Sequence, residues 1–233
     1  MTRFISVLIL SVLFFAASSN IWAAYAEGRV VRICYEPWAP FASSDESGNL
    51  IGPAREIVDA NFKKLGWEPT YIELPYKRCV RAVASGTVHA ILMDDENNEA
   101  LLPSYLQTGS WDLSFLVLKG TYKNSEELLA MPDARIALSF EYEYPENVLS
   151  MLGQRAMPMK IDTDNIFNLL TGNRVHAILE DHLWLQGLID GSGFDGAVVM
   201  LPPLVSLKQY LSFSPMHKDL LEVINSSVPD LGS

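Results

Sequence analysis

The chain has 233 residues and a formal net charge of −11, with 17 basic against 28 acidic side chains. The basic residues are scattered, and only Lys63-Lys64 and Lys77-Arg78 are adjacent. Because binding to phosphate backbones depends on clustered Lys and Arg, this composition excludes a nucleic acid partner. An acidic surface mainly keeps a protein in solution.

The first 26 residues have the three parts of an export signal. Arg3 comes first, a mostly apolar run covers residues 4–17, and the small-residue stretch Ala23-Ala24-Tyr25-Ala26 follows. A membrane anchor is the alternative, but a spanning helix needs about 20 apolar residues and residues 18–20 are polar. We therefore predict a signal peptide over residues 1–26, and a mature protein without stable membrane insertion.

The first part of the mature chain alternates strands with helices. A β-branched apolar run predicts a strand over residues 30–35, and apolar residues at helical spacing predict a helix over 53–65 that Gly66 stops. The next predicted elements are a strand over 70–74, a helix over 76–85 and a strand over 88–93. Strands separated by helices pair in parallel through right-handed crossovers.

A short stretch of the sequence occurs twice. The string Val-His-Ala-Ile-Leu covers residues 88–92 and again residues 175–179, each time after a Gly and before acidic residues. Five matching residues in an apolar strand can arise by chance, so the repeat supports two similar lobes without proving a duplication. We expect His89 and His176 to be core histidines with one hydrogen-bonded nitrogen.

The rest of the chain predicts a second lobe and a return to the first. The predicted strands cover residues 135–140, 159–161, 175–179, 197–201 and 207–213, and the predicted helices cover 146–152, 165–170, 182–189 and 218–226. We expect a first lobe over residues 27–119, a second lobe over 120–202, and a return to the first lobe over 203–233. The chain would then pass between the two lobes twice, and these two connections would form a hinge. The predicted fold class is α/β, with a mainly parallel sheet flanked by helices in each lobe.

Five motifs occur in an order that resembles a known family. They are Tyr35-Glu36-Pro37-Trp38-Ala39-Pro40-Phe41, Leu74-Pro75-Tyr76-Lys77-Arg78, Ser85-Gly86, Phe140-Glu141-Tyr142-Glu143-Tyr144-Pro145, and residues 172–181. Together they resemble the periplasmic solute-binding proteins of family 3, the branch usually attached to polar amino acid ABC transporters. The resemblance implies a two-lobed, type II periplasmic binding protein fold, a ligand in the cleft between the lobes, and closure on binding. It also implies a monomer in the periplasm with an ABC permease as partner.

The sequence departs from this family at two points. Members that bind amino acids usually carry an Arg after the third strand, whereas residues 94–100 here read Asp-Asp-Glu-Asn-Asn-Glu-Ala. The aspartates common in the two copies of the repeat are replaced by His89 and His176. The first departure makes a simple α-amino acid ligand doubtful.

Aromatic side chains follow the first strand of each lobe, where ligands of open α/β sheets bind. Tyr35, Trp38 and Phe41 could stack against a solute, and we favour Trp38 and Phe41 as pocket walls over ordinary packing residues. In the second lobe, Tyr142 and Tyr144 occupy the matching loop, and the free amides before the next helix could receive an anion.

Three charged residues complete the predicted ligand-binding set. Arg78 could hold a carboxylate in a bidentate fork, with a surface salt bridge as the equally weighted alternative. Asp181 takes the position where the resemblance implies an ammonium ligand, and Glu180 could serve instead. Asp94 is the matching acid of the first lobe, with a helix N-cap as its alternative role.

The two cysteines, Cys34 and Cys79, could form a disulfide or remain as buried thiols. A strand order of 2-1-3 in the first lobe would bring the second helix over the first strand, and Cys79 over Cys34. A bridge closing this loop would then add about 3 to 4 kcal/mol.

The sequence leaves three function classes open. Solute capture for a transporter comes first, a ligand sensor without a permease second, and a dehydratase or lyase on the same scaffold third, with Glu36, Glu141 or Asp181 as its acid or base. No motif of a hydrolase or metalloprotease is present, and the four His lack metal-ligand spacing. We therefore expect no enzyme activity, no cofactor and no metal.

Overall fold

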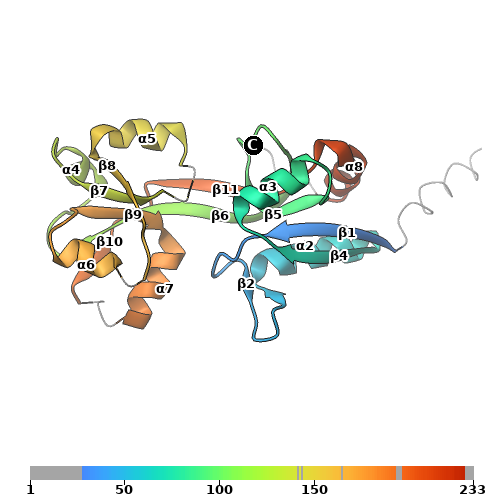
Figure 1. Cartoon of the computed structure of the whole chain (residues 1–233), viewed down its shortest axis with the longest axis horizontal. Coiled ribbons are helices and arrows are strands. Elements are labelled where there is room, and N and C mark those ends of the chain that lie inside the picture. Colours follow the sequence, from blue (N-terminus) through green and yellow to red (C-terminus); the bar gives the residue numbers. More distant parts are fainter. Residues whose placement is uncertain (1–27, 141, 143, 164, 193–195, 229–233) are drawn as a thin grey trace, which may run out of the picture. The chain divides into compact units, whose positions relative to one another are not determined.

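A computed structural model describes residues 28–228, except for 141, 143, 164 and 193–195 (Figure 1). The predicted signal peptide lies outside the described residues, as does Glu141. Within the described part, none of the helices has the length and apolar character needed to cross a membrane.

The described chain forms two compact units. Unit 1 holds the described residues up to Gly109 and those from Gln209 onward, and unit 2 holds residues Ser110 to Lys208. The expected lobe boundaries, after residues 119 and 202, therefore differ from these divisions. The reason is that the chain passes between the units inside two long strands, β6 (Leu102–Leu118) and β11 (Val205–Phe213), rather than in loops.

Unit 1 is a sheet with the strand order β4-β1-β5-β11. Strand β1 pairs in parallel with both β4 and β5, and β11 is antiparallel to β5. For the three predicted strands this is the order 2-1-3. The elements are β1 (Arg29–Tyr35), β2 (Ser43–Ser44), β3 (Leu50–Ile51), α2 (Pro53–Leu65), β4 (Trp67–Glu73), α3 (Tyr76–Ala84), β5 (Ala90–Asp95), a 3-10 turn η2 (Pro215–His217) and α8 (Lys218–Ser227).

Helix α2 shows how local sequence determines an element of unit 1. Pro53 occupies the first turn, where its missing N–H costs nothing, and Gly66 ends the helix in the left-handed conformation with φ 68°. The buried face of α2 carries Ala54, Val58 and Phe62. The Phe62 ring packs edge to face on Trp67 at 5.2 Å between ring centroids, so α2 is fixed directly to the strand that follows it.

Unit 2 repeats the layout with the strand order β6-β9-β7-β8, and β10 pairs with β6. Strand β7 is parallel to β8 and β9, whereas β6 is antiparallel to β9. The elements are α4 (Ser125–Leu129), β7 (Ile136–Ser139), α5 (Glu146–Leu152), a 3-10 turn η1 (Gly153–Arg155), β8 (Ala156–Met159), α6 (Ile166–Thr171), β9 (Ala177–Asp181), α7 (His182–Ser192) and β10 (Val198–Met200). The strand predicted over residues 159–161 thus lies over 156–159.

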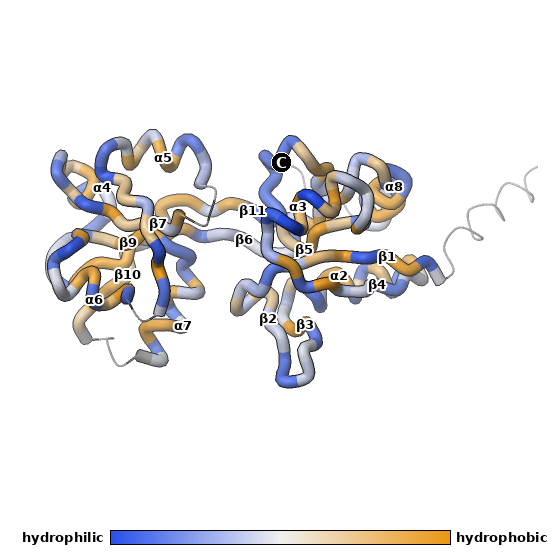
Figure 2. The backbone as a smooth tube through the Cα atoms, in the orientation of Figure 1, coloured by the Kyte–Doolittle hydropathy of each residue, from blue (hydrophilic) through white to orange (hydrophobic). Residues whose placement is uncertain are grey.

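Each unit has its own hydrophobic core. In unit 1, Ile33, Phe62 and Phe213 are fully buried, and in unit 2, Phe115, Ile136 and Leu152 are fully buried. The hydropathy of the backbone tube agrees, because β5 in unit 1 and β9 and β10 in unit 2 are hydrophobic (Figure 2). Among the described residues there are four hydrophobic clusters, two in each unit, and none mixes residues of both units, which confirms the predicted two-lobed α/β architecture.

The repeated string takes the same structure in both units. The Arg32 backbone N–H donates to His89 Nδ1 at 2.8 Å, and the Arg135 N–H donates to His176 Nδ1 at 2.9 Å. In each pair, the backbone N–H of the His also donates a hydrogen bond to the backbone carbonyl of the same Arg. Both histidines therefore have one hydrogen-bonded ring nitrogen, as predicted. They are only half-buried and lie just before β5 and β9, so the prediction that they are core residues inside these strands is wrong.

The register of the repeated strands also matches. Ala90 pairs with Ile33 in unit 1, and Ala177 pairs with Ile136 in unit 2. Counting from the two histidines, Asp94 and Asp181 hold equivalent positions at the ends of β5 and β9.

Candidate functional site

The loop after β1 in unit 1 is a tight hairpin that presents two aromatic rings. Trp38 and Ala42 exchange backbone hydrogen bonds of 2.6 and 2.8 Å, and the Trp38 and Phe41 rings meet edge to face at 5.8 Å. Gly109 allows a close approach here, because a Cβ at this position would lie only 3.3 Å from the Phe41 ring. Both rings pack partly buried on the core of unit 1.

Tyr35 is placed differently from the other two aromatic residues. Its side chain is buried, and its hydroxyl donates to Glu73 Oε2 at 3.2 Å and lies 3.3 Å from Ser44 Oγ. Ser44 donates to the same carboxylate oxygen at 2.9 Å. This network holds the end of β1 against β4, so Tyr35 supports the loop that carries Trp38.

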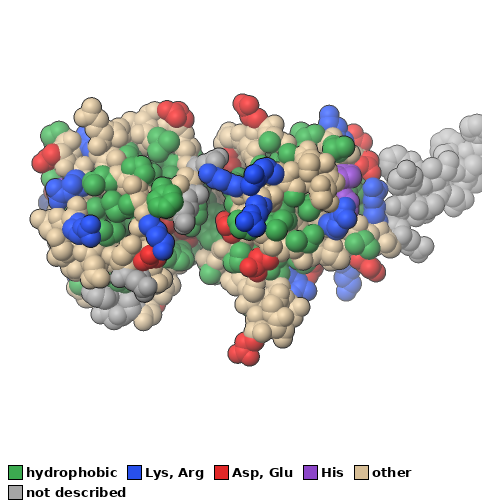
Figure 3. Space-filling view, viewed as in Figure 1, with side chains coloured by type: hydrophobic (Ala, Val, Ile, Leu, Met, Phe, Trp, Pro, Cys, Tyr) green, Lys and Arg blue, Asp and Glu red, His purple; other side chains and the backbone are tan. Residues whose placement is uncertain are grey.

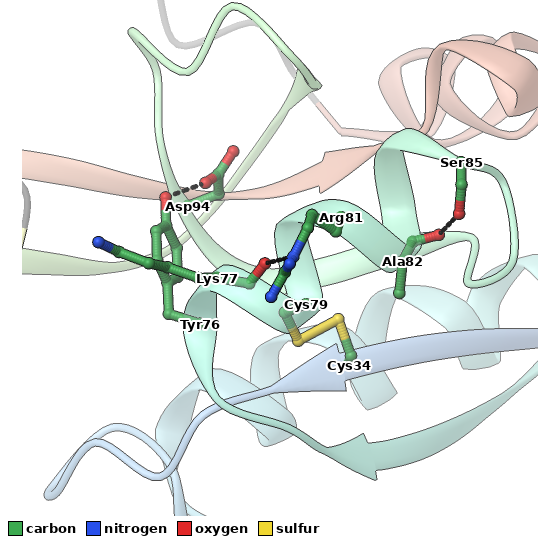
Figure 4. The surroundings of a disulfide bond; sticks show 8 residues. All are labelled: Cys34, Tyr76, Lys77, Cys79, Arg81, Ala82, Ser85 and Asp94. Atoms are coloured by element: carbon green, nitrogen blue, oxygen red, sulfur yellow. Dashed lines mark hydrogen bonds between the residues drawn. A yellow bond between two sulfur atoms is a disulfide. The ribbon is translucent and has the colours of Figure 1, made fainter.

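Arg78 lies in the first turn of α3, next to a disulfide. Cys34 of β1 and Cys79 of α3 are joined, with their Cα atoms 5.7 Å apart (Figure 4). The two sulfurs are buried, whereas the Arg78 side chain is exposed. Lys and Arg side chains gather over α3 in the space-filling view (Figure 3). Among the described residues, the Arg78 guanidinium forms no hydrogen bond or ion pair, which leaves its five donors available.

Asp94 is a fully buried carboxyl group at the end of β5. Its Oδ1 accepts from the Tyr76 hydroxyl at 2.8 Å (Figure 4) and from Asn98 Nδ2 at 2.9 Å. Its Oδ2 has no hydrogen-bond partner among the described residues. Burial raises the pKa of Asp94. A loop follows β5 rather than a helix, so the alternative role as an N-cap is wrong.

Asp181 is the residue that caps a helix. It precedes α7, and its Oδ1 accepts from the Trp184 N–H at 2.8 Å. Its Oδ2 is buried and lacks a hydrogen-bond partner within the described part of the chain. Burial, together with a smaller contribution from the nearby carboxylate of Asp112, raises the pKa of Asp181 to about 6. Asp94 and Asp181 thus share an equivalent position, a buried Oδ2 without a hydrogen-bond partner among the described residues, and a raised pKa.

Glu180 lies beside Asp181 in the same strand. It is buried, and its Oε2 accepts from the Asp181 backbone N–H at 2.6 Å. Burial raises the pKa of Glu180 to about 7. Glu180 is therefore a second titratable group near neutrality in unit 2.

The two predicted tyrosines of unit 2 differ in exposure. Tyr144 is buried, accepts from the Ser139 N–H at 3.1 Å and donates to the Leu179 carbonyl at 3.5 Å, so it ties the ends of β7 and β9 together. Burial raises the pKa of Tyr144. Tyr142 is 47% exposed. Only Tyr142 of this pair has substantial surface for contact with another molecule.

Sequence reasoning missed Trp111 and Asp112, at the point where β6 enters unit 2. The Trp111 ring lies 5.9 Å from Tyr142 and 5.3 Å from Tyr144, measured between centroids. The sequence did not mark them, because only the structure shows that burial alternates along residues 102–108 and becomes continuous from Leu113 to Val117. The residues between the two patterns are those at the strand's entry to a second core.

The predicted residues therefore form two groups, each within its own unit. In unit 1, Trp38, Phe41 and Arg78 follow strands, and Asp94 lies at the end of β5. In unit 2, Tyr142 and Tyr144 follow β7, and Asp181 is the last residue of β9. Glu36 is exposed in the loop after β1. The described residues contain no group of three His, Cys, Asp or Glu placed to hold a metal ion.

No family model and no curated protein matches the sequence. Solved structures do match the fold. The arginine-bound ArgBP of T. maritima superposes with a TM-score of 0.63 at 18% identity, over 92% of this chain and all of that one. The chain has the type II periplasmic binding protein fold.

Other proteins with this fold are similarly distant in sequence. A binding component of an ABC transporter from Wolinella succinogenes, complexed with lysine, has a TM-score of 0.66 at 18% identity, over 84% of this chain and 87% of that one. The L-cystine solute receptor of Neisseria gonorrhoeae, unliganded and open, has a TM-score of 0.62 at 16% identity, over 86% and 85%. These superpositions show the fold, and at such low identity they leave the ligand undetermined.

Proposed function

We propose that this protein is a periplasmic solute-binding protein that captures one small polar solute with residues of both units. The observation that carries the proposal is the paired placement of ligand-type groups after the strands of each unit. Unit 1 offers Trp38 and Arg78, and unit 2 offers Tyr142 and Asp181. In open α/β sheets, the carboxyl ends of parallel strands are where ligands bind.

The chemistry of these groups suits an amino acid-like or carboxylate-bearing solute. The exposed guanidinium of Arg78 can hold a carboxylate in a bidentate fork, and the adjacent Cys79 is attached to β1 through the disulfide. The partly buried rings of Trp38 and Phe41 provide apolar walls.

The proposal includes export, a hinge and a transporter partner. The apolar run of residues 4–17 supports a signal peptide and the periplasm. The two long strands that pass between the units, β6 and β11, support a hinge. A structural neighbour described as a binding component of an ABC transporter supports a permease partner. A sensor lacking a permease differs only in that partner, so a pull-down with ABC permeases distinguishes the two.

A dehydratase or lyase is the second candidate, because Asp181 has the shifted pKa that an acid or base needs. Burial raises this pKa to about 6. We favour solute binding over catalysis, because one oxygen of Asp181 already accepts a hydrogen bond at the start of α7 and is not available as an acid or base. Turnover of the bound solute, followed by mass spectrometry, would support the enzyme.

The test is mass spectrometry of the solute that copurifies with the mature protein. One solute per chain is expected, and Arg78→Ala should abolish its retention. Arg81→Ala is the matched control, since Arg81 lies on the same helix and donates to the Lys77 carbonyl. Retention by Arg78→Ala would remove Arg78 from the site, and no bound solute in any preparation would refute the function.

A further inference from the structure

A pair of histidines joins the C-terminal segment, η2 and α8, to the rest of unit 1. The His89 ring lies just before β5, and it meets the His217 ring of η2 edge to face at 4.6 Å between centroids. The Ser214 backbone N–H donates to the His89 carbonyl at 2.9 Å, and His217 Nε2 lies 3.3 Å from the Gly86 carbonyl oxygen. The chain that leads into α8 is therefore attached to unit 1 at His89 and Gly86.

Hydrogen bonds determine the protonation states that this arrangement accepts. His89 Nδ1 accepts from the Arg32 backbone N–H at 2.8 Å, so the proton of the neutral ring is on Nε2. Gly86 offers a carbonyl oxygen to His217, so His217 Nε2 is the donor in that contact. A second proton on His89 would have to bind Nδ1, where it would face the Arg32 N–H, which is also a donor. The docked arrangement therefore requires a neutral His89.

The charges around His89 also oppose its protonation. Burial is the largest cause that lowers the pKa of His89 to about 4. Three cations act in the same direction, in the order His217, Arg32 and Arg29. Asp219 of α8 acts in the opposite direction, but its carboxylate is paired with Arg29 at 2.9 Å. Detaching the C-terminal segment would remove His217 and expose the His89 ring, so the pKa of His89 would return toward its usual value of about 6.5.

We propose that His89 and His217 form an acid-sensitive latch, which holds η2 and α8 on unit 1 at neutral pH and releases them as the pH falls below about 6. Protonation of His89 removes its hydrogen bond to Arg32 and adds repulsion from His217, whereas the detached segment leaves His89 free to accept the proton. The latch goes beyond the proposed function, because His89 precedes β5 while the predicted solute-binding groups lie at or after strand ends.

The remaining contacts of α8 determine how strongly it is docked at neutral pH. Leu220 and Ile224 are fully buried, and Asn225 Oδ1 accepts from the Tyr105 backbone N–H at 2.8 Å. None of these groups titrates. Release takes up one proton at His89, so the ratio of detached to docked molecules should rise by up to about tenfold per pH unit between about 6.5 and 4.

Hydrogen exchange of the mature protein, followed by mass spectrometry from about pH 7 to about pH 4.5, tests the latch. Each exchange rate is divided by the intrinsic rate of an unstructured peptide at the same pH, which gives the protection of each segment. Between about pH 6.5 and 4.5, the protection of α8 should fall by about 10- to 40-fold. The protection of β9 and α7 in unit 2 should fall by less than about threefold.

Three variants assign the fall to the histidine pair. His89→Gln keeps an acceptor for the Arg32 N–H but does not titrate, so α8 should lose less than about threefold in protection. His217→Gln keeps a donor for Gly86 and removes one positive charge, so its loss should lie between those of His89→Gln and the wild type. His176→Gln is the matched control and should behave as the wild type, because His176 makes the same ring hydrogen bond in unit 2.

The outcomes are independent of any solute. A protection of α8 that does not change with pH overturns the latch, and so does an equal fall in both units, which is global unfolding. A wild-type fall in His89→Gln also overturns it. If His89→Gln does not fold, His217→Gln decides, because a fall as large as that of the wild type would show that the pair is not involved. Each of these results leaves solute capture by the protein untouched.

Discussion

Removing the disulfide of unit 1 should lower the free energy of unfolding by about 4 kcal/mol. Cys34 and Cys79 are separated by 45 residues, and both are fully buried. Closing a loop of this length removes about 13 cal/mol/K of entropy from the unfolded chain, which at 25 °C is about 4 kcal/mol. The bond therefore contributes a large share of the usual stability of a protein domain.

The assay is urea unfolding of the wild type, both single Cys→Ala variants and the double variant. Either single substitution breaks the bond, so each should lose about 4 kcal/mol or slightly more, and the double variant should lose little beyond that. Reductant during unfolding should bring the wild type close to the variants. Two small, additive losses of about 1 kcal/mol each would refute the reasoning, because that is the cost of removing two unlinked sulfur atoms from a core.

Three further side chains give the remaining predictions. Phe62→Ala should cost about 3 to 5 kcal/mol in urea unfolding, because the ring is fully buried against Trp67; a loss below about 1 kcal/mol would contradict this packing. Burial lowers the pKa of His89 to about 4, so the native state binds fewer protons than the unfolded state, and the His89 contribution to stability should fall as pH drops from about 6.5 to about 4. The stability difference between wild type and His89→Gln measures this, and a difference that is constant with pH would exclude it. For Asp181 the pKa is raised to about 6, so its ionisation should cost stability as pH rises from about 4 to 6, and Asp181→Asn, which keeps the cap of α7, should be about 2 kcal/mol more stable than wild type at pH 8 but not at pH 4.

Local signals predicted several elements with correct boundaries. The helices over residues 53–65 and 146–152 match α2 and α5, because a proline at or beside the first residue and a glycine after the last one define both. The parallel order of β4, β1 and β5 also follows from alternating strands and helices.

The passage of the chain between the units could not be predicted from such signals. Strand β6 has 17 residues, contains Pro103 and Gly109, and lies on two different cores in turn. No single hydrophobic period describes it, so sequence reasoning left the segment without a strand and missed Trp111 and Asp112 with it. As a result, the first lobe was predicted to end at residue 119, whereas the structure divides the units after Gly109.

The roles of the two equivalent aspartates depended on the element after each strand. Helix α7 begins directly after Asp181, whereas residues 96–101 after β5 contain no helix, so the cap belongs to Asp181. The sequence places an acid at both positions but does not show where the next helix begins. The hydrogen bond that Tyr76 donates to Asp94 is a tertiary contact that no local pattern encodes.

Small-angle X-ray scattering of the mature protein, with and without its identified solute, tests the central claim most directly. If both units hold one solute and β6 and β11 act as hinges, saturating solute should decrease the radius of gyration, and Arg78→Ala should show no decrease at the same concentration. An unchanged radius of gyration in wild-type protein that calorimetry shows to be saturated would contradict capture by both units.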